Sequence, residues 1–386
     1  DHSFSHAAYA FFSSSLKKSK ALVLTMDAFG DNVNYSARIF SPSSKNSIPK
    51  IDLITQGDNL IIARLYRYIT LLLGLKPDEH EYKVMGLAPY CKPQYYTPLL
   101  NKFKKLQKVK GLKFVYKNKP KDLYFAIKEI IDGHRFDSIA GAVQKYTEDL
   151  ISEWVMNCVK HSKIKNVIIA GGIAMNVKNN LLISKNNKIK RLIVPGTPDD
   201  TSQSIGACYS QYYFNNKKNN NSCKFYPIND LYLGPNSNTN NIYSNIESHF
   251  PRKKYKIYHS NINKIAAKEL FKGKIIGRCS GKSEFGSRAL GNRSILADPS
   301  NQKIKITINE KVKNRDFWMP FAPVIIDTYV EKYIINPKGI ESPHMTIGFE
   351  TTPEGYSAMK AACHPSDKSV RPQILKSDAN PDLYNI

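Results

Sequence analysis

The sequence lacks any apolar run long enough to cross a membrane. Its longest apolar stretches, such as TLLLGL at residues 70–75, fall well short of the roughly 20 residues that a membrane-spanning helix needs. It also lacks a basic segment followed by an apolar run and a small-residue cleavage site at its start, the pattern of an export signal. We therefore expect a cytoplasmic protein without a membrane partner.

Cysteine is scarce and scattered. The six cysteines form no CxxC pair, which argues against a zinc site and against a disulfide framework. We expect reduced thiols that serve mostly as small, buried hydrophobic side chains.

Acidic residues are few beside the basic ones. The chain of 386 residues has 32 Asp and Glu against 57 Lys and Arg, a formal net charge of +25. Such an excess can serve nucleic-acid binding, because Lys and Arg neutralise phosphates. Here it is mostly lysine spread over the chain, together with many Asn and Ile and 23 Tyr, as an AT-rich coding sequence produces. A nucleic-acid partner is not the expectation, although the charge leaves that alternative open.

The first part of the chain has the pattern of an α/β domain. A length of 386 residues favours two domains of roughly 100–200 residues each. A buried strand is predicted at residues 21–25, and a long amphipathic helix at 137–160 with Asp137 as its N-cap. Strands at 166–170 and 191–194, separated by a glycine turn and a helix, predict a parallel α/β unit.

The second part is predicted to be α/β as well. The polar, low-complexity run FNNKKNNNSCKF at residues 214–225 has no periodicity, so we place the domain boundary there, between residues 1–222 and 223–386. Beyond it, KIIG at 274–277 and APVII at 322–326 have strand patterns. A helix is expected over residues 301–313.

Two histidines and two aspartates form the first candidate site. The spacing of His2 and His6 places both imidazoles on one face of a helix, one turn apart. The glutamate of an HExxH metalloprotease is absent, so this is not a zincin. Asp27 and Asp200 lie at strand or turn ends, and imidazoles with carboxylates suit iron, manganese or zinc. Two incidental helix histidines remain the alternative.

The segment AGGIAMN at residues 170–176 forms the second candidate site. Gly171 and Gly172 follow a buried strand, where they would let the backbone approach a phosphate at the start of a helix. Asn176 is either a ligand or a helix-surface residue, and a purely structural turn is equally open. The segment HEYKVMGLAPY at residues 80–90 by itself predicts only a surface ion pair of Glu81 or Lys83.

A cationic loop forms the third candidate site. In SGKSEFGSRALGNRSILADP at residues 280–299, three cations alternate with three glycines, so the backbone can fold tightly while the cations project towards a shared anion. Further cations follow near the end of the chain. The predicted anion-binding residues are Lys282, Arg288, Arg293, Lys313, Arg315 and Arg371.

Taken together, the motifs resemble those of the O-carbamoyltransferases of antibiotic and nodulation-factor biosynthesis, the NodU/CmcH type. The matching segments run in family order along nearly the whole chain: HSFSHAAYAFF, LTMDAFGD, HEYKVMGLAPY, DSIAGAVQKYTED, AGGIAMN, PDDTSQSIGA, GKSEFGSRALGNRSILADP, WMPFAPVI, SPHM and HPSDKSVRPQ. The resemblance implies the C-terminal part of an actin-like ATPase (ASKHA) fold domain, followed by a YrdC-like α/β domain. It also implies that the chain is truncated at both ends relative to the family.

The resemblance further implies a two-step chemistry. The second domain would form carbamoyl-adenylate from carbamoyl phosphate and ATP with Mg²⁺, and the first would pass the carbamoyl group to a hydroxyl of a sugar-like or secondary-metabolite acceptor. An iron-like divalent metal would be held by His2, His6, Asp27 and Asp200, with manganese or zinc as alternatives. The nucleotide would contact Gly171, Gly172 and Asn176, and carbamoyl phosphate with ATP would bind Arg288, Lys313, Arg315 and Arg371.

Several points stay open at this level. The family usually has Arg where this chain has Lys282, and Lys cannot form a bidentate contact with an anion. A threonylcarbamoylation-type enzyme acting on tRNA and a non-catalytic nucleotide-binding relic of the fold remain as rival functions. The acceptor and the oligomeric state, with a homodimer among the alternatives, cannot be deduced from the motifs.

Overall fold

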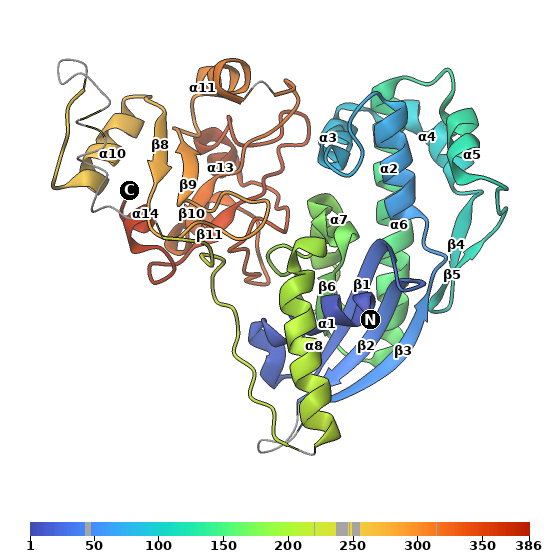
Figure 1. Ribbon diagram of the computed structural model, residues 1–386. Helices are drawn as coiled ribbons and strands as arrows, with labels where there is room; N and C mark the ends of the chain where they lie inside the picture. Colours follow the sequence, from blue (N-terminus) through green and yellow to red (C-terminus); the bar gives the residue numbers. More distant parts are fainter. Residues whose placement is uncertain (43–47, 220, 237–245, 247, 249–254, 314) are drawn as a thin grey trace.

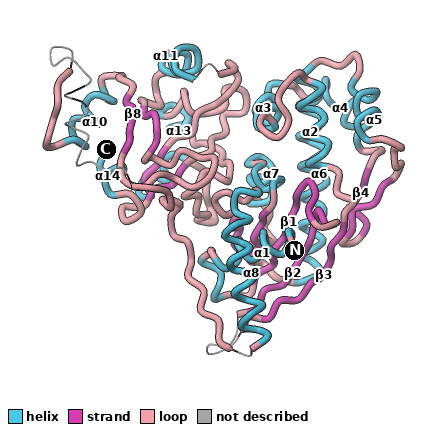
Figure 2. Tube along the Cα trace, viewed as in Figure 1, coloured by secondary structure: helices cyan, strands magenta, loops and turns pink. Residues whose placement is uncertain are grey.

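The computed structural model describes residues 1–42, 48–219, 221–236, 246, 248, 255–313 and 315–386. The described chain is a mixed α/β structure with one central sheet, which confirms the predicted α/β class (Figures 1 and 2). The finer assignments, an actin-like domain and a YrdC-like domain, stay predictions. Among the described residues, no helix is long and apolar enough to cross a membrane.

The central sheet has five strands in the order β3-β2-β1-β6-β7. The strands span Ala21–Gly30 (β1), Val33–Ser41 (β2), Lys50–Gly57 (β3), Asn166–Ala170 (β6) and Arg191–Ile193 (β7). β1, β2 and β3 pair antiparallel, whereas β1, β6 and β7 run parallel to one another. The parallel unit predicted around residues 166–194 is therefore confirmed.

Helices cover both faces of this sheet because its central strands are apolar on both sides. Leu22, Leu24 and Met26 of β1 join the core formed with α2 (Ile62–Leu72) and α6 (Phe136–Ser162). Ala21 and Val23, which point the opposite way, join the core formed with α1 (His2–Phe12) and α8 (Gln203–Lys218). Figure 1 shows α1 and α8 beside each other.

Shorter elements complete the N-terminal region, by which we mean residues 1–222. They are α3 (Glu81–Leu87), α4 (Pro93–Phe103), the hairpin of β4 (Gln107–Lys110) and β5 (Lys113–Tyr116), α5 (Leu123–Ile131) and α7 (Val177–Ser184). Short 3-10 turns occur at Ser15–Lys18 (η1), Ala88–Tyr90 (η2), Gly172–Met175 (η3) and Asp200–Ser202 (η4).

The C-terminal region, residues 223–386, has short elements and long loops. Two-stranded sheets pair β8 (Ile276–Cys279) with β9 (Arg293–Leu296) and β10 (Val324–Ile326) with β11 (Gln373–Leu375). The helices are α10 (Ile262–Phe271), α11 (Gln302–Thr307), a π-helical turn Ile308–Lys313 (η6), the 3-10 turn Asp327–Tyr329 (η7), α12 (Val330–Tyr333), α13 (Pro353–Ala358) and α14 (Pro381–Asn385).

The two regions are packed together. Ile347 and Phe349 of the C-terminal region belong to the same hydrophobic core as the α2/α6 face of the sheet. Lys338 donates from Nζ to the backbone carbonyls of Ser184, Asn186 and Ile189, at 2.6, 2.6 and 3.0 Å, just beyond the end of α7. The boundary at residues 222/223 thus remains a prediction about the sequence, within a chain whose two halves share a core.

Three local predictions need correction. Asp137 is not an N-cap: α6 begins one residue earlier, and the Asp137 carboxylate accepts hydrogen bonds from the Arg135 guanidinium at 3.1 and 2.8 Å. The strand predicted at 21–25 continues to Gly30 because it turns directly into β2. The polar run at 214–225 is helical up to Lys218, since α8 continues through its first residues.

Two more predictions are only partly right. The strand expected at 274–277 is shifted to β8, Ile276–Cys279, where it pairs with β9. The cysteines are free, as expected, but only Cys91, Cys158 and Cys363 are buried, whereas Cys208 and Cys279 are exposed.

Candidate active site

The candidate site lies at the edge of the sheet where the parallel strands end. Because β1, β6 and β7 run in the same direction, the residues at their carboxyl ends meet at one edge. Asp27 stands in the last part of β1, Gly171 follows β6, and Asp200 follows β7 in η4. The first turns of α1, which precedes β1, add His2 and His6 to the same edge.

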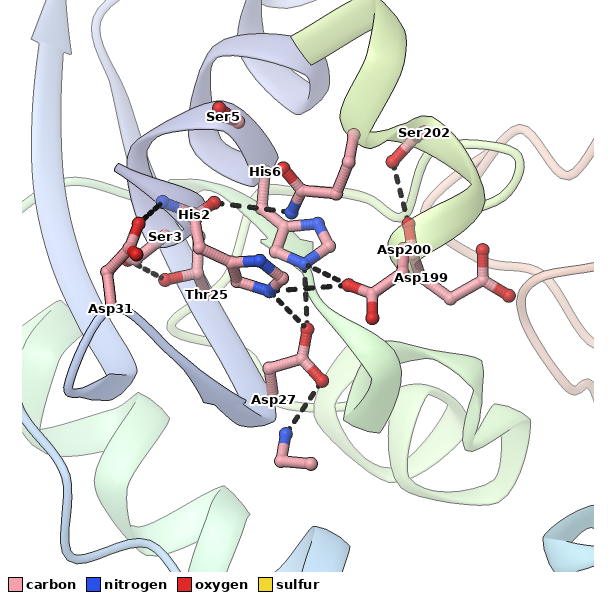
Figure 3. A network of polar contacts seen from close by, with 12 residues as sticks. His2, Ser3, Ser5, His6, Thr25, Asp27, Asp31, Asp199, Asp200 and Ser202 are labelled. Atoms are coloured by element: carbon pink, nitrogen blue, oxygen red, sulfur yellow. Dashed lines mark hydrogen bonds and ion pairs between the residues drawn. The ribbon is translucent and has the colours of Figure 1, made fainter. Parts of the chain in front are cut away.

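Four side chains converge there, as Figure 3 shows. The Asp27 Oδ2 atom lies 2.7 Å from His6 Nε2 and 3.3 Å from His2 Nε2. The Asp200 Oδ1 atom lies 3.3 Å from each of the same two nitrogens. One potential ligand atom from each of the four residues falls within 4.8 Å of all the others. The structure brings together the four residues that the sequence predicted as metal ligands.

The backbone around this cluster is held in place by its own hydrogen bonds. The Asp1 carboxylate caps α1 by accepting from the Phe4 amide at 3.1 Å. The His2 amide donates to the Asp31 carboxylate at 2.8 Å. The second carboxylate oxygen of Asp27 accepts from the Ala28 amide at 2.7 Å, which fixes the orientation of the carboxylate. The cluster is therefore ordered by the protein itself.

Within the cluster, each of the four side chains favours the charged form of its partners. Hydrogen bonds that His2 donates to the Asp200 and Asp27 carboxylates raise its pKa to about 10. Burial opposes protonation of His6, but the same two carboxylates outweigh it and raise its pKa. Burial likewise opposes ionisation of Asp27, yet the two histidines lower its pKa, and they lower the pKa of Asp200 too. Two positive and two negative groups thus neutralise one another.

The donor set fits a divalent transition metal. Two imidazole nitrogens and two carboxylate oxygens are ligands that iron, manganese and zinc accept. The side chain of His6 is fully buried, whereas that of Asp200 is 71% exposed, so one side of the cluster is open to a small molecule. His6 Nδ1 is buried without a partner among the described residues, so nothing outside the cluster competes for the ring.

The glycine turn lies directly beside the cluster. Gly171 has φ +89, and a Cβ there would lie 2.1 Å from the Met26 carbonyl oxygen, so only glycine fits. A Cβ on Gly172 would lie 3.1 Å from Asp27 Oδ1. The side chain of Asn176 caps α7 by accepting from the Asn179 amide at 3.0 Å, and it donates to Gln144 at 2.9 Å. The structure thus gives Gly171 and Asn176 clear structural roles.

The cationic loop is organised by a carboxylate. Glu284 Oε1 accepts from three backbone amides, those of Leu290, Asn292 and Arg293, at 2.9, 2.7 and 3.0 Å. Burial opposes the charge of Glu284, but these hydrogen bonds prevail and lower its pKa. A single acidic side chain therefore closes the loop that the glycines allow to turn.

Three of the predicted cations gather into an arginine pocket, which we define as Arg288, Arg315 and Arg371. Burial and the positive charges of Arg288 and Arg315 hold the pKa of Arg371 well below its usual range. Burial also lowers the pKa of Arg288, and the Asp199 carboxylate offsets this in part. Within the described residues, none of the three guanidinium groups forms an ion pair or a side-chain hydrogen bond, and Arg288 Nε is buried without a partner. Partly buried guanidinium groups without an acidic partner favour the binding of an anion.

The remaining predicted cations are placed differently. The Arg293 guanidinium donates to the carbonyls of Ser280, Gly281 and Asn292 at 2.9, 3.1 and 3.0 Å, so it braces the loop. The side chains of Lys282 and Lys313 are exposed. The structure does not gather these three cations into the arginine pocket.

Some residues of the site were not foreseen from the sequence. Lys83 forms an ion pair of 2.9 Å with Asp316, which makes it a contact between the two regions rather than a surface pair. Thr197 lies between the cationic loop and the metal cluster and has φ +50, which is rare for a β-branched residue. The short segment PGTPDD around Thr197, rich in turn residues, was the available signal.

Comparison with known proteins identifies the family of the chain. The family profile described as Carbamoyltransferase N-terminus matches residues 1–209, and that described as Carbamoyltransferase C-terminus matches residues 267–386. Uncharacterized proteins MJ1058 and MJ1051 of Methanocaldococcus jannaschii are 30% and 31% identical to this chain over its whole length. Nodulation protein NolNO of Sinorhizobium fredii is 26% identical, again over the whole chain.

This chain spans 64%, 72% and 55% of the lengths of these three relatives. The two profiles leave only residues 210–266 of the chain unmatched. On the strength of both profile matches, the chain belongs to the carbamoyltransferase family.

Proposed function

We propose that this chain performs O-carbamoyl transfer by way of a carbamoyl-adenylate. In the first step water cleaves carbamoyl phosphate to carbamate and phosphate. A carbamate oxygen then attacks the α-phosphorus of ATP, and the bond to the β-phosphate breaks to release pyrophosphate. In the second step the oxygen of an acceptor hydroxyl attacks the carbamoyl carbon, AMP leaves, and the hydroxyl proton passes to solvent. The products are the O-carbamoylated acceptor, AMP, pyrophosphate and phosphate.

The observation that carries the first step is the arginine pocket. The positive charges of Arg288 and Arg315, together with burial, lower the pKa of Arg371, and Arg288 Nε is buried without a hydrogen-bond partner among the described residues. Planar guanidinium groups bind phosphate oxygens in pairs of hydrogen bonds. Carbamoyl phosphate and ATP with Mg²⁺ are anions of the kind that such a pocket accepts, and their bound charge would relieve the repulsion among the arginines. The same groups would stabilise the charge that develops during phosphoryl displacement.

The second step is assigned to the cluster of His2, His6, Asp27 and Asp200. A divalent metal bound there would supply Lewis-acid polarisation of the carbamoyl carbonyl. The protein's own contribution is to keep both imidazoles and both carboxylates converged, through the Asp1 cap of α1 and the bonds at Asp31 and Ala28. The exposed side of Asp200 supports access of a small acceptor. We propose a sugar-like or secondary-metabolite hydroxyl as that acceptor.

The experiment that tests this function is pyrophosphate release. The protein is incubated with carbamoyl phosphate and ATP in the presence of Mg²⁺ and, in parallel, iron, manganese or zinc. We expect pyrophosphate to appear only when carbamoyl phosphate is present. Arg371→Ala should reduce the rate by a factor of about 100, the scale of losing one transition-state contact. Arg67→Ala, which removes an exposed arginine paired with Asp78, serves as the matched control and should leave the rate unchanged. Absence of carbamoyl phosphate-dependent pyrophosphate under every metal condition would refute the proposal.

A further inference from the structure

One short loop carries Asp200 and is bonded to two neighbouring segments of the candidate metal cluster. This linking loop, residues 195–200, accepts at the Gly196 carbonyl from the Tyr9 hydroxyl of α1 at 2.5 Å. Its Pro198 carbonyl accepts from the Gly171 amide at 2.8 Å, beside the end of β1. Its last residue is Asp200 itself. The helix with both histidines and the glycine turn after β6 are thus both bonded to the loop that carries Asp200.

The centre of the linking loop is a strained residue. Thr197 is buried, and its φ of +50 places a β-branched side chain in the left-handed region. Such a backbone conformation is unfavourable for a β-branched residue and persists only where its surroundings enforce it. Here the Thr197 hydroxyl donates to the Gly196 carbonyl at 2.7 Å and lies 3.4 Å from the Tyr9 hydroxyl. The hydroxyl therefore faces α1, which carries both histidines.

The methyl group of Thr197 contacts the cationic loop. A Cβ added to Gly286 would lie 1.7 Å from Thr197 Cγ2, so the Gly286 backbone and the Thr197 methyl group leave no room for a further atom. Gly286 stands two residues before Arg288. Both lie in the part of the loop that is closed by the hydrogen bonds of the Leu290 and Asn292 amides to the Glu284 carboxylate. In Figure 3 the neighbouring Asp199 side chain points away from both imidazoles, and its charge acts on Arg288. The contact between Gly286 and Thr197 therefore lies between the loop that carries Arg288 and the loop that carries Asp200.

We propose that Thr197 is a positioning residue that couples the arginine pocket to the metal cluster. This inference rests on the proposed function, since it assigns an anion to the pocket and a metal to the cluster. An anion drawing Arg288 into place fixes the cationic loop, and Gly286 then presses the linking loop into the position that aligns Asp200 with the two histidines. Because binding couplings are reciprocal, a metal in the cluster must favour anion binding by the same factor.

The coupling is measured as the effect of an anion on metal affinity. Mn²⁺ binding to the whole protein is titrated by electron paramagnetic resonance in sodium sulfate and in sodium chloride of equal ionic strength. We expect sulfate to tighten Mn²⁺ binding by about fivefold or more, the usual lower range of such couplings. In Thr197→Ser, which keeps the hydroxyl and removes only the methyl group, the factor should fall to about one. A Thr197→Ser protein that retains the full sulfate effect would overturn the proposal, because the field of the charges alone would then explain the coupling.

A matched pair of glycine variants isolates the contact. Gly286→Ala and Gly281→Ala both place a side chain at positive φ in the same loop, at +97 and +56. Only the first directs its methyl at Thr197, since the nearest atom to a Cβ at Gly281 is Asn292 Nδ2 at 3.4 Å. We expect Gly286→Ala to weaken Mn²⁺ binding by about tenfold and Gly281→Ala to change it by less than twofold. The double variant Gly286→Ala/Thr197→Ser should recover most of the loss. Equal effects of the two glycine variants, or no recovery, contradict the coupling.

The result also separates this inference from the proposed function. Wild-type protein that binds Mn²⁺ and releases pyrophosphate but shows no sulfate effect refutes the coupling alone. Wild-type protein that neither binds Mn²⁺ nor releases pyrophosphate refutes the proposed function and the coupling with it.

Discussion

The metal cluster and the arginine pocket both contain charged side chains, but only in the cluster do charges of opposite sign neutralise one another. In the cluster, two histidines and two aspartates neutralise one another at distances of 2.7–3.3 Å. In the pocket, the charges of Arg288 and Arg315 oppose that of Arg371, and no ion pair with a carboxylate is formed by these arginines among the described residues. A balanced set of charges is stable before its ligand arrives, whereas an unbalanced set loses stability until an anion binds. The difference predicts that the same kind of substitution acts in opposite directions at the two sites.

The largest effect is expected from removing a buried ligand of the cluster. His6→Ala deletes an imidazole that contacts both carboxylates, so Mn²⁺ or Fe²⁺ affinity should fall by at least about 100-fold, more than the loss of a supporting group causes. Calorimetric titration of the metal measures this. His161→Ala, which removes an exposed histidine from the last turn of α6, should leave the affinity unchanged. Unchanged binding in His6→Ala would place the metal elsewhere.

The second prediction concerns two histidines outside the cluster. Their pKa values are lower than in the unfolded chain, whereas those of His2 and His6 are raised. Burial lowers the pKa of His364 and of His344 to about 4, against 6.5 in the unfolded chain. The unfolded chain therefore binds protons first as the pH falls, and stability should decrease between about pH 6.5 and pH 4 by on the order of 2 kcal/mol per histidine. Urea unfolding at pH 7.5, 5.5 and 4.5 measures this decrease.

A variant at His364 tests how much of that pH dependence this histidine contributes. His364 Nε2 lies 2.7 Å from the Gly86 carbonyl, so the neutral ring donates there. His364→Gln keeps a donor and removes the titration, so its stability should depend less on pH than that of the wild type. A variant with the full wild-type pH dependence would show that His364 does not contribute.

A third prediction tests the unbalanced charges of the arginine pocket. Without an anion, Arg371→Met should unfold at an equal or higher urea concentration, with a gain of about 1–2 kcal/mol, because it removes a repelled and buried charge. Asp27→Asn in the cluster should instead destabilise the protein, since it leaves two raised-pKa histidines with one partner fewer. Destabilisation of both variants by the same amount would show that the pocket is balanced by a partner of its own.

The smallest effect concerns the ion pair between the regions. Lys83 and Asp316 keep side-chain exposures of 16% and 29%, so solvent partly reaches their ion pair, whose atoms lie 2.9 Å apart. A double-mutant cycle with Lys83→Ala and Asp316→Ala should give a coupling of about 1 kcal/mol or less. A coupling of several kcal/mol would mean that the contact between the regions depends on this pair rather than on the shared hydrophobic core.

The two sites also differ in how far the sequence could predict them. The residues of the cluster were predicted because helical spacing joins His2 to His6, and because Asp27 and Asp200 follow recognisable strands. Arg293 could not be separated from Arg288 by sequence, since each follows a glycine by two residues in the same loop. Only the fold shows that one guanidinium is bonded to three carbonyls and the other to none.

In the fold, too, features set by local sequence were predicted, and features set by other residues were not. The strands of the parallel unit were predicted from the length of their apolar runs, because apolar runs bounded by turns are local signals. The error at Asp137 arose because a side chain that can cap a helix instead bonds to Arg135, a choice that depends on the neighbouring residues. The role of Thr197 depends on the contact with Gly286, 89 positions further along the chain in SGKSEFGSRALGNRSILADP, and no local pattern contains it.

The ammonium group of Lys338 has a consequence for how the protein could be taken apart. It occupies the place where three carbonyl oxygens converge beyond the end of α7, much as a bound potassium ion would. Acetylation of this one nitrogen removes the charge and leaves the carbonyls facing a neutral amide. We expect such a chain to keep both sites while the contact between its two regions weakens.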